Sequence, residues 1–121
     1  MEYDTLVIEM LKAFPELREL YEEELEDWDG EDPGPHNIFG EIFNPYLIRQ
    51  LKEDKNEKLK LIFKFLEEMA ISQNEFVQEV LVCTVLEYLG DDKLLLCRAH
   101  DYMEYNTKKL SDEIERGLGR K

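Results

Sequence analysis

Eight carboxylates crowd into residues 22–32 of this chain, with no lysine or arginine among them. Such a dense group of carboxylates can bind a metal cation or meet a positively charged protein surface. A tryptophan inside the group can anchor a protein interface, because large aromatic side chains often carry much of the binding energy. We refer to residues 22–32 as the acidic stretch. Its candidate partner-binding residues are Glu22, Glu23, Glu24, Glu26, Asp27, Trp28, Asp29, Glu31 and Asp32.

The position of the acidic stretch indicates that local stability did not select it. The apolar periodicity predicts a helix that ends near Asp27, and the C-terminal end of a helix carries partial negative charge. Each acid placed there is unfavourable by roughly a few tenths of a kcal/mol. A segment that opposes local stability is where a functional surface is expected. The alternative is a solvated acidic turn that only improves solubility.

The negative charge of the chain is concentrated in its first half. The formal net charge is −14: residues 1–54 contain 16 acids and 4 bases, a net charge of −12, and residues 55–121 contain 13 acids and 11 bases, a net charge of −2. Nucleic acid repels so negative a chain, so direct binding of DNA or RNA is not expected. The expected partner is a basic protein.

The two histidines, His36 and His100, carry no flanking signature of a catalytic base. Nucleophilic catalysis needs a base and a group that orients it, and neither a nucleophile elbow nor a glycine-rich phosphate loop is present. We therefore expect no catalytic residue and no enzymatic activity. An enzyme is the minority alternative, and its pocket would need the convergence of Asp27, Asp29, Glu31, Asp32 and His36.

The sequence contains no regular metal motif. Cys83 and Cys97 are fourteen residues apart, which does not fit a zinc knuckle, and their apolar surroundings favour packing as small buried side chains. A calcium loop that begins at Asp27 would need glycine at its sixth position, but Gly30 stands at the fourth. We expect no cofactor and no structural metal; looser binding of calcium or magnesium by the acidic stretch stays open.

Apolar residues recur at steps of three and four along most of the chain, which predicts amphipathic helices. Ser72 and Glu75 have the spacing of a capping box, and Gly90 suits the C-terminal end of a helix. Asp91 or Asp92 can cap the helix that follows. The predicted helices cover residues 6–13, 15–27, 45–51, 58–71, 73–89, 91–103 and 106–117.

Two segments are predicted to lack regular structure. The run between Trp28 and Asn37 contains two glycines, two prolines and no apolar residue, so a long acidic loop is predicted over residues 28–37. Residues 38–43 then predict a short apolar turn, after which Asn44 and Pro45 can open a helix. Residues 117–121 are expected to form a flexible tail.

These elements predict an all-α fold in a single domain over residues 1–121. Short turns between successive helices favour antiparallel neighbours in a compact bundle of about six to seven helices. Stacked helical hairpins of the HEAT-like kind are one arrangement of such a bundle. They would pair residues 58–71 with 73–89 and residues 91–103 with 107–117.

The expected location is the cytoplasm, without a membrane partner. No apolar run approaches the roughly 18 residues of a membrane span, and the first residues lack the basic and apolar segments of a signal peptide. Two cysteines without a disulfide framework fit a reducing compartment. The sequence leaves the oligomeric state open.

In size, charge and helical character, the chain resembles the small acidic immunity proteins of bacterial polymorphic or contact-dependent toxin systems. The acidic stretch is the most specific element of this resemblance. The resemblance implies a bacterial inhibitor that binds a basic toxin domain, commonly a nuclease, with carboxylates that imitate the nucleic-acid backbone. Because such proteins diverge strongly in sequence, the resemblance assigns no residue by position.

A helical scaffold or adaptor is the alternative function. It would bind a protein or peptide in a groove between helices 58–71 and 73–89, and the acidic stretch would serve solubility. An exposed apolar groove away from residues 22–32 would favour the adaptor. An inhibitor that uses the acidic stretch is expected to associate rapidly and in a salt-sensitive manner, because exposed charges are screened over about 8 Å at physiological ionic strength.

Overall fold

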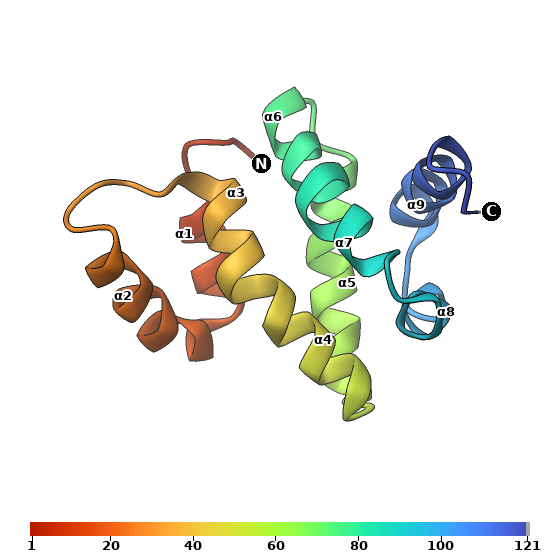
Figure 1. Ribbon diagram of the computed structural model, residues 1–121, viewed down its shortest axis with the longest axis horizontal. Helices are drawn as coiled ribbons and strands as arrows, with labels where there is room; N and C mark the ends of the chain where they lie inside the picture. The colour runs from red at the N-terminus through yellow and green to blue at the C-terminus, as the bar shows by residue number, and fades with distance from the viewer. Residues whose placement is uncertain (121) are drawn as a thin grey trace.

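The computed structural model describes residues 1–120, which form helices joined by turns, with no strand among them (Figure 1). A 3-10 turn (η1) precedes α2, and two segments have π-helical geometry (η2 and η3). In chain order the elements are α1 (Leu6–Ala13), η1 (Pro15–Leu17), α2 (Arg18–Asp27), α3 (Gly34–Ile38), η2 (Phe39–Phe43), α4 (Asn44–Lys52), α5 (Asn56–Ala70), α6 (Glu75–Glu79), η3 (Val80–Leu86), α7 (Glu87–Leu89), α8 (Lys93–His100) and α9 (Tyr105–Gly117).

Two long helices run without interruption through several of these elements. The backbone stays in the right-handed helical region where α3 passes into η2 and η2 into α4, and again where α6 passes into η3 and η3 into α7. Counted in this way, residues 1–120 form seven helices. The predicted all-α bundle is confirmed.

The loop predicted over residues 28–37 is shorter than expected, because a helix already begins at Gly34. Gly34 has a φ of +81°, which glycine adopts without steric cost, and its N–H donates to Oδ1 of Asp32. Pro35 then supplies a preset φ in the first turn. A glycine and a proline therefore start this helix, although both predicted a loop.

The separate apolar turn predicted over residues 38–43 is also wrong, since these residues continue the same helix. Asn44 lies inside that helix and does not cap it. In π-helical segments such as η2 and η3 an extra residue enters the turn, and a search for steps of three and four does not reveal it. The two π segments contact each other, and a Cβ on Gly40 would lie 3.7 Å from Cγ2 of Thr84.

Phe14 is the aromatic hub of the core. Its ring centroid lies 6.1 Å from that of Phe43, 5.7 Å from that of Phe65 and 5.8 Å from that of Tyr46. Phe14 is fully buried at the end of α1, so these contacts join α1 to the helix of η2 and α4 and to α5. Burial of one such ring contributes about 2 to 3 kcal/mol.

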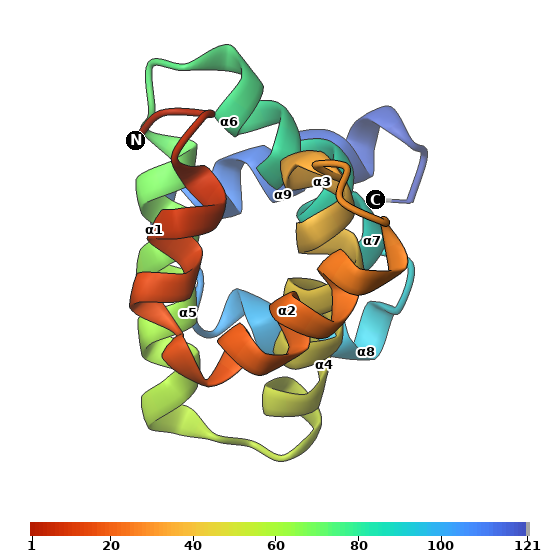
Figure 2. The same ribbon diagram turned by 90° about the vertical axis from the view of Figure 1, so that its left-hand side faces the viewer.

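The helices form three groups across the longest axis of the molecule (Figure 1). The first two helices lie at one end, and α8 and α9 lie at the other; the long helices and α5 lie between them. α9 contacts α5 and η3, whereas α8 contacts α4. Each of the last two helices therefore packs against the central group. The view turned by 90° places α2 in front of the other helices (Figure 2).

The ends of the later helices differ in part from the prediction. Asn74, rather than Ser72, caps α6, because its Oδ1 accepts from the N–H groups of Phe76 and Val77. Asp92 caps α8 as predicted. Gly90 ends its helix with a φ of −68°, so it does not supply a left-handed turn.

The cysteines do not pack in the core as predicted, because both are exposed. Cys83 lies within η3, where the extra residue of a π turn shifts which side chains face inward. Partial desolvation of the thiol, followed by the nearby carboxylates of Glu87 and Glu79, raises the pKa of Cys83 above its usual range. Cys97 lies on α8, whose buried residues are Leu95, Leu96 and Ala99.

The tail expected over residues 117–121 includes Lys121, which lies outside the described residues. Arg120 donates to the carboxylates of Glu115 and Asp91. No helix within residues 1–120 is both long enough and apolar enough to span a membrane.

Candidate functional site

The acidic stretch begins on α2, the helix that is least embedded in the fold. No residue of α2 is fully buried, and Leu20 is 50% exposed. Tyr21, Glu24 and Leu25 are half-buried and face the body of the protein. The fold therefore holds α2 by one narrow stripe and leaves most of its surface to solvent.

Seven of the nine predicted binding residues are exposed, and Glu24 and Trp28 are half-buried. Trp28 Nε1 donates to Oε2 of Glu24 at 2.9 Å, so the indole lies along α2 and does not project from it. Asp29 and Gly30 have positive φ angles of 51° and 87°, which end the helix. The structure brings the glutamates together on one helix and places Asp29, Glu31 and Asp32 on the following turn.

None of the eight acids of the acidic stretch has an ion-pair partner within residues 1–120. The nearby Glu16 differs, because Lys58 Nζ lies 2.8 Å from its Oε2. Glutamates four residues apart on a helix are neighbours at about 5 to 6 Å between Cβ atoms, and like charges at that spacing repel. The stretch therefore forms an uncompensated negative surface.

A pocket of about 400 Å³ lies between α1, α2 and the start of α3. Val7, Ile8 and Tyr21 supply apolar surface, and the carboxylates of Asp4 and Asp32 lie among the lining residues. Ile8 is 52% exposed although it belongs to a helix with a buried face. The acidic stretch thus borders a hollow that is partly apolar.

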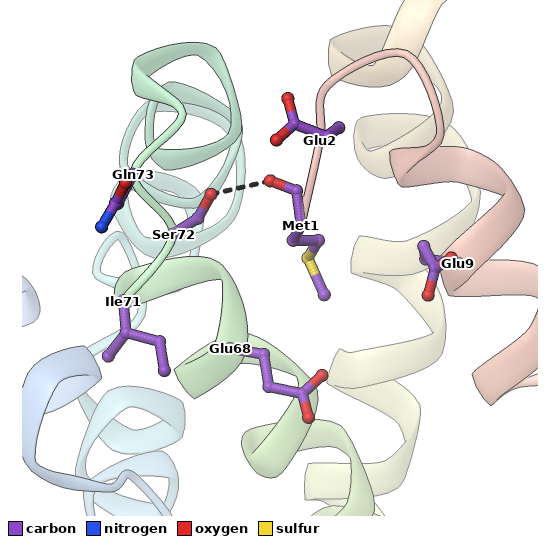
Figure 3. A pocket seen from close by; sticks show the side chains of 7 residues that line it. All are labelled: Met1, Glu2, Glu9, Glu68, Ile71, Ser72 and Gln73. Carbon is purple, nitrogen blue, oxygen red and sulfur yellow. Dashed lines mark hydrogen bonds between the residues drawn. The ribbon is translucent and has the colours of Figure 1, made fainter.

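A second pocket, of about 480 Å³, lies between the first residues of the chain and the end of α5 (Figure 3). Carboxylates from three different segments line it, those of Glu2, Glu9 and Glu68, around the side chain of Met1. The Ser72 hydroxyl donates to the carbonyl oxygen of Met1 at 2.8 Å and fixes the position of the segment. This pocket also carries negative charge.

The two histidines each contact a hydroxyl group. His36 Nδ1 lies 2.6 Å from Thr84 Oγ1, and His100 Nε2 lies 3.3 Å from Ser111 Oγ. Ser111 is 1% exposed, so a substrate cannot reach its hydroxyl. Within residues 1–120 the hydrogen bond of His36 goes to Thr84 and not to Asp27, Asp29, Glu31 or Asp32.

No group of three or more histidine, cysteine, aspartate or glutamate side chains within residues 1–120 is arranged to hold a metal ion. The acidic stretch carries many carboxylates, but they spread along α2 and the turn after it. Geometry therefore favours a role for these charges at an extended surface, because a compact cation site needs convergent oxygens.

A comparison with known protein families relates the whole helical array to one of them. A family model described as "Domain of unknown function (DUF7674)" matches residues 7–119. The chain belongs to this family. No curated protein and no solved structure matches it. The DUF7674 match spans α1 to α9 and includes the entire acidic stretch.

Sequence reasoning missed the hollow parts of the site of this DUF7674 protein. Ile8 could have indicated a pocket from the sequence, because it is a large apolar residue outside the buried stripe of its own helix. The pockets themselves form only when residues 1–4 meet residues that are distant along the chain. Local patterns contain no information about such a meeting.

Proposed function

We propose that this DUF7674 protein is a non-catalytic inhibitor that binds a basic protein through the acidic stretch, and that the bound protein is a toxin or nuclease domain. The observation that carries the proposal is the row of eight neighbouring carboxylates without an ion-pair partner within residues 1–120. Unpaired charge of one sign raises the local potential and steers an oppositely charged partner onto the surface.

The way in which α2 is held supports this role. Glu22, Glu23 and Glu26 are exposed on a helix that offers no fully buried residue to the core. Their repulsion costs stability and yields no local contact in return. A bound cationic surface would relieve that repulsion, so binding energy would come from charges that are unfavourable in the free protein.

The nature of the partner follows from the same charge. A nuclease cleft must attract phosphate and is therefore basic, so carboxylates at regular spacing can occupy it in place of nucleic acid. The resemblance to immunity proteins of bacterial toxin systems agrees with such a partner. The proposal assigns no chemical step to this chain, because inhibition needs only that the cleft be filled.

The test is co-purification with the basic product of a neighbouring gene, at low and at high salt. The variant Glu22→Gln, Glu23→Gln, Glu26→Gln, Asp27→Asn removes four charges from the acidic stretch. We expect it to weaken binding about tenfold or more and to flatten the salt dependence. Titration calorimetry measures both effects.

A matched control removes four exposed acids elsewhere, in the variant Glu53→Gln, Asp101→Asn, Glu104→Gln, Glu113→Gln. Because the two variants have the same net charge, any difference between them reports the location of the charge. Binding that is equally strong in both variants, with the salt dependence of the unaltered protein, would contradict the proposal.

A helical adaptor is the second candidate, and the pocket at the end of α5 is the observation that favours it. That pocket lies beside the turn that joins α5 to α6, and the groove expected for an adaptor lies between the helices on either side of this turn. Ile71 and Phe76 near this turn are 60% and 59% exposed. An adaptor would bind its ligand with little dependence on the acidic stretch, which the same calorimetry measures.

A further inference from the structure

The first four residues of the chain lie among three adjoining pockets. Tyr3 and Asp4 line both the pocket beside α2 and a pocket of about 460 Å³ next to α6. Glu2 lines this pocket and also the one at the end of α5. The pockets therefore form a continuous series, which we call the N-terminal row.

Residues 1–3 are fixed to the turn before α6 and to α6 itself by three successive contacts. Ser72 Oγ donates to the Met1 carbonyl at 2.8 Å. Asn74 Nδ2 donates to Oε2 of Glu2 at 3.1 Å, and the rings of Phe76 and Tyr3 have centroids 5.7 Å apart. These contacts organise the row before any ligand arrives, which reduces the entropy cost of binding.

Every charged side chain that lines the N-terminal row is a carboxylate. None of them has a lysine or arginine partner within residues 1–120. Apolar surface lies beside this charge, since Ile8 and Phe76 line two of the pockets and are 52% and 59% exposed. The five carboxylates are those of Glu2, Asp4, Glu9, Asp32 and Glu68.

We propose that the N-terminal row binds an extended cationic segment of the basic partner, in which a lysine or arginine and an apolar residue take turns at every second position. Charge complementarity selects the cationic residues, and the exposed apolar side chains select those between them. An extended segment fits a series of pockets, because its alternate side chains point to the same side about 7 Å apart. The inference rests on the proposed function and names the part of the partner that is held.

The acidic stretch and the N-terminal row would then have different roles in binding. The exposed charges of α2 attract and orient the partner, and the row holds one of its segments. Asp32 belongs to both, so the two surfaces are continuous.

The test uses a fluorescein-labelled peptide of about ten residues with the repeat Lys-Ser-Leu-Ser, which places Lys and Leu on the same side of an extended chain, and measures its anisotropy with the full chain. The row variant is Glu2→Gln, Asp4→Asn, Glu9→Gln, Glu68→Gln, and the matched control is the four-charge variant of the acidic stretch. Both have a net charge of −10, from −14 plus 4. We expect the row variant to weaken binding about tenfold and the control about twofold or less.

A second pair of variants tests the apolar part. The double substitution Ile8→Ser, Phe76→Ser should weaken peptide binding several-fold, and Leu94→Ser, at a residue that is 69% exposed on α8, should not. Circular dichroism must first show the same helix content and melting temperature in all variants. A peptide in which Glu replaces every Lys should not bind.

Three outcomes would overturn the inference. Equal weakening by the two charge variants would mean that net charge alone attracts the peptide. Weakening by the acidic-stretch variant alone would place the segment on α2 and leave the proposed function intact. No binding of the lysine peptide at low salt would remove the row as a site. If instead the peptide binds the row but no basic protein co-purifies, the proposed function fails and the row stands.

Discussion

The guanidinium of Arg120 holds both carboxylate oxygens of Glu115, with Nε 2.9 Å from Oε1 and Nη2 2.7 Å from Oε2. Glu115 is only 4% exposed, and a carboxylate removed from water needs such a partner. Arg120 Nη1 also donates to Asp91 Oδ1 at 2.8 Å. Arg120, which follows α9, thereby joins this end of the chain to Asp91 in the turn after α7.

A Cβ on Gly90 would overlap the ends of the Glu115 and Arg120 side chains, so this ion pair would have to shift. We predict that Gly90→Ala lowers the free energy of unfolding by about 1 to 3 kcal/mol, as other overpacking substitutions do. Urea denaturation followed by circular dichroism measures the change. Gly117→Ala is the control, since nothing lies within 4 Å of its added Cβ. It should be neutral or slightly stabilising, and an equal loss in both variants would contradict the prediction.

Glu67 on α5 caps the start of α9, which lies far along the chain. Its two carboxylate oxygens accept four hydrogen bonds, from the N–H and side chain of Asn106 and from the N–H and hydroxyl of Thr107. We predict that Glu67→Ala costs about 2 kcal/mol of stability, because an N-cap and a link between two helices are lost together. The neighbouring substitution Glu68→Ala removes an exposed carboxylate and should cost much less.

The contribution of Glu67 should depend on pH. Burial raises the pKa of Glu67, but the hydrogen bonds from Thr107 and Asn106 lower it by more, so the pKa in the folded protein lies below the ordinary value of 4.5. The stabilisation is therefore fully present above the ordinary value and is lost as the pH falls through the folded value. The difference in unfolding free energy between the unaltered protein and Glu67→Ala should shrink below pH 4.5. A difference that stays constant to lower pH would contradict this explanation.

The acidic stretch should lower the stability of the free protein. Glu23, Glu26 and Asp27 lie in the last turns of α2, where the helix dipole and their mutual repulsion are both unfavourable. We predict that Glu23→Gln, Glu26→Gln, Asp27→Asn raises the unfolding free energy by roughly 0.5 to 1 kcal/mol at low salt, and by less at high salt. Thermal denaturation at two salt concentrations measures this. A loss of stability would indicate that these acids make a favourable interaction in the free protein.

Those features of the fold that local chemistry determines are readable from the sequence. Pro15 and Asp92 act within their own turns, so the starts of two helices were predicted correctly. The acidic stretch was readable for the same reason, because composition alone defines it. Its exposure on α2 follows from a helix in which carboxylates outnumber apolar residues.

Features that depend on distant contacts could not be read in this way. Ser72 has the spacing of a cap, but its hydroxyl bonds to Met1, and Asn74 takes its place. Gly90 resembles a helix-ending glycine, but its actual constraint is the Glu115 carboxylate from α9. The N-terminal row likewise needs residues 1–4 to meet residues 72–76, which no local pattern specifies.

Asn44 is a buried polar residue where the two π segments meet, and it provides the sharpest test of that packing. It is 4% exposed; its Nδ2 donates to the Thr84 carbonyl at 2.9 Å, and its Oδ1 has no partner within residues 1–120. We predict that Asn44→Asp costs about 3 to 5 kcal/mol at neutral pH, because a buried carboxylate would face another acceptor. Asn44→Ala should cost only about 1 to 3 kcal/mol, from the lost hydrogen bond.

The cost of Asn44→Asp should depend on pH, because burial should raise the pKa of the introduced carboxyl group above its unfolded value. At acidic pH the carboxyl group binds a proton, which it can donate to the Thr84 carbonyl. The extra cost of Asn44→Asp over Asn44→Ala should therefore decrease as the pH falls. Denaturation of both variants at neutral and acidic pH measures this, and equal costs at every pH would mean that water reaches Oδ1.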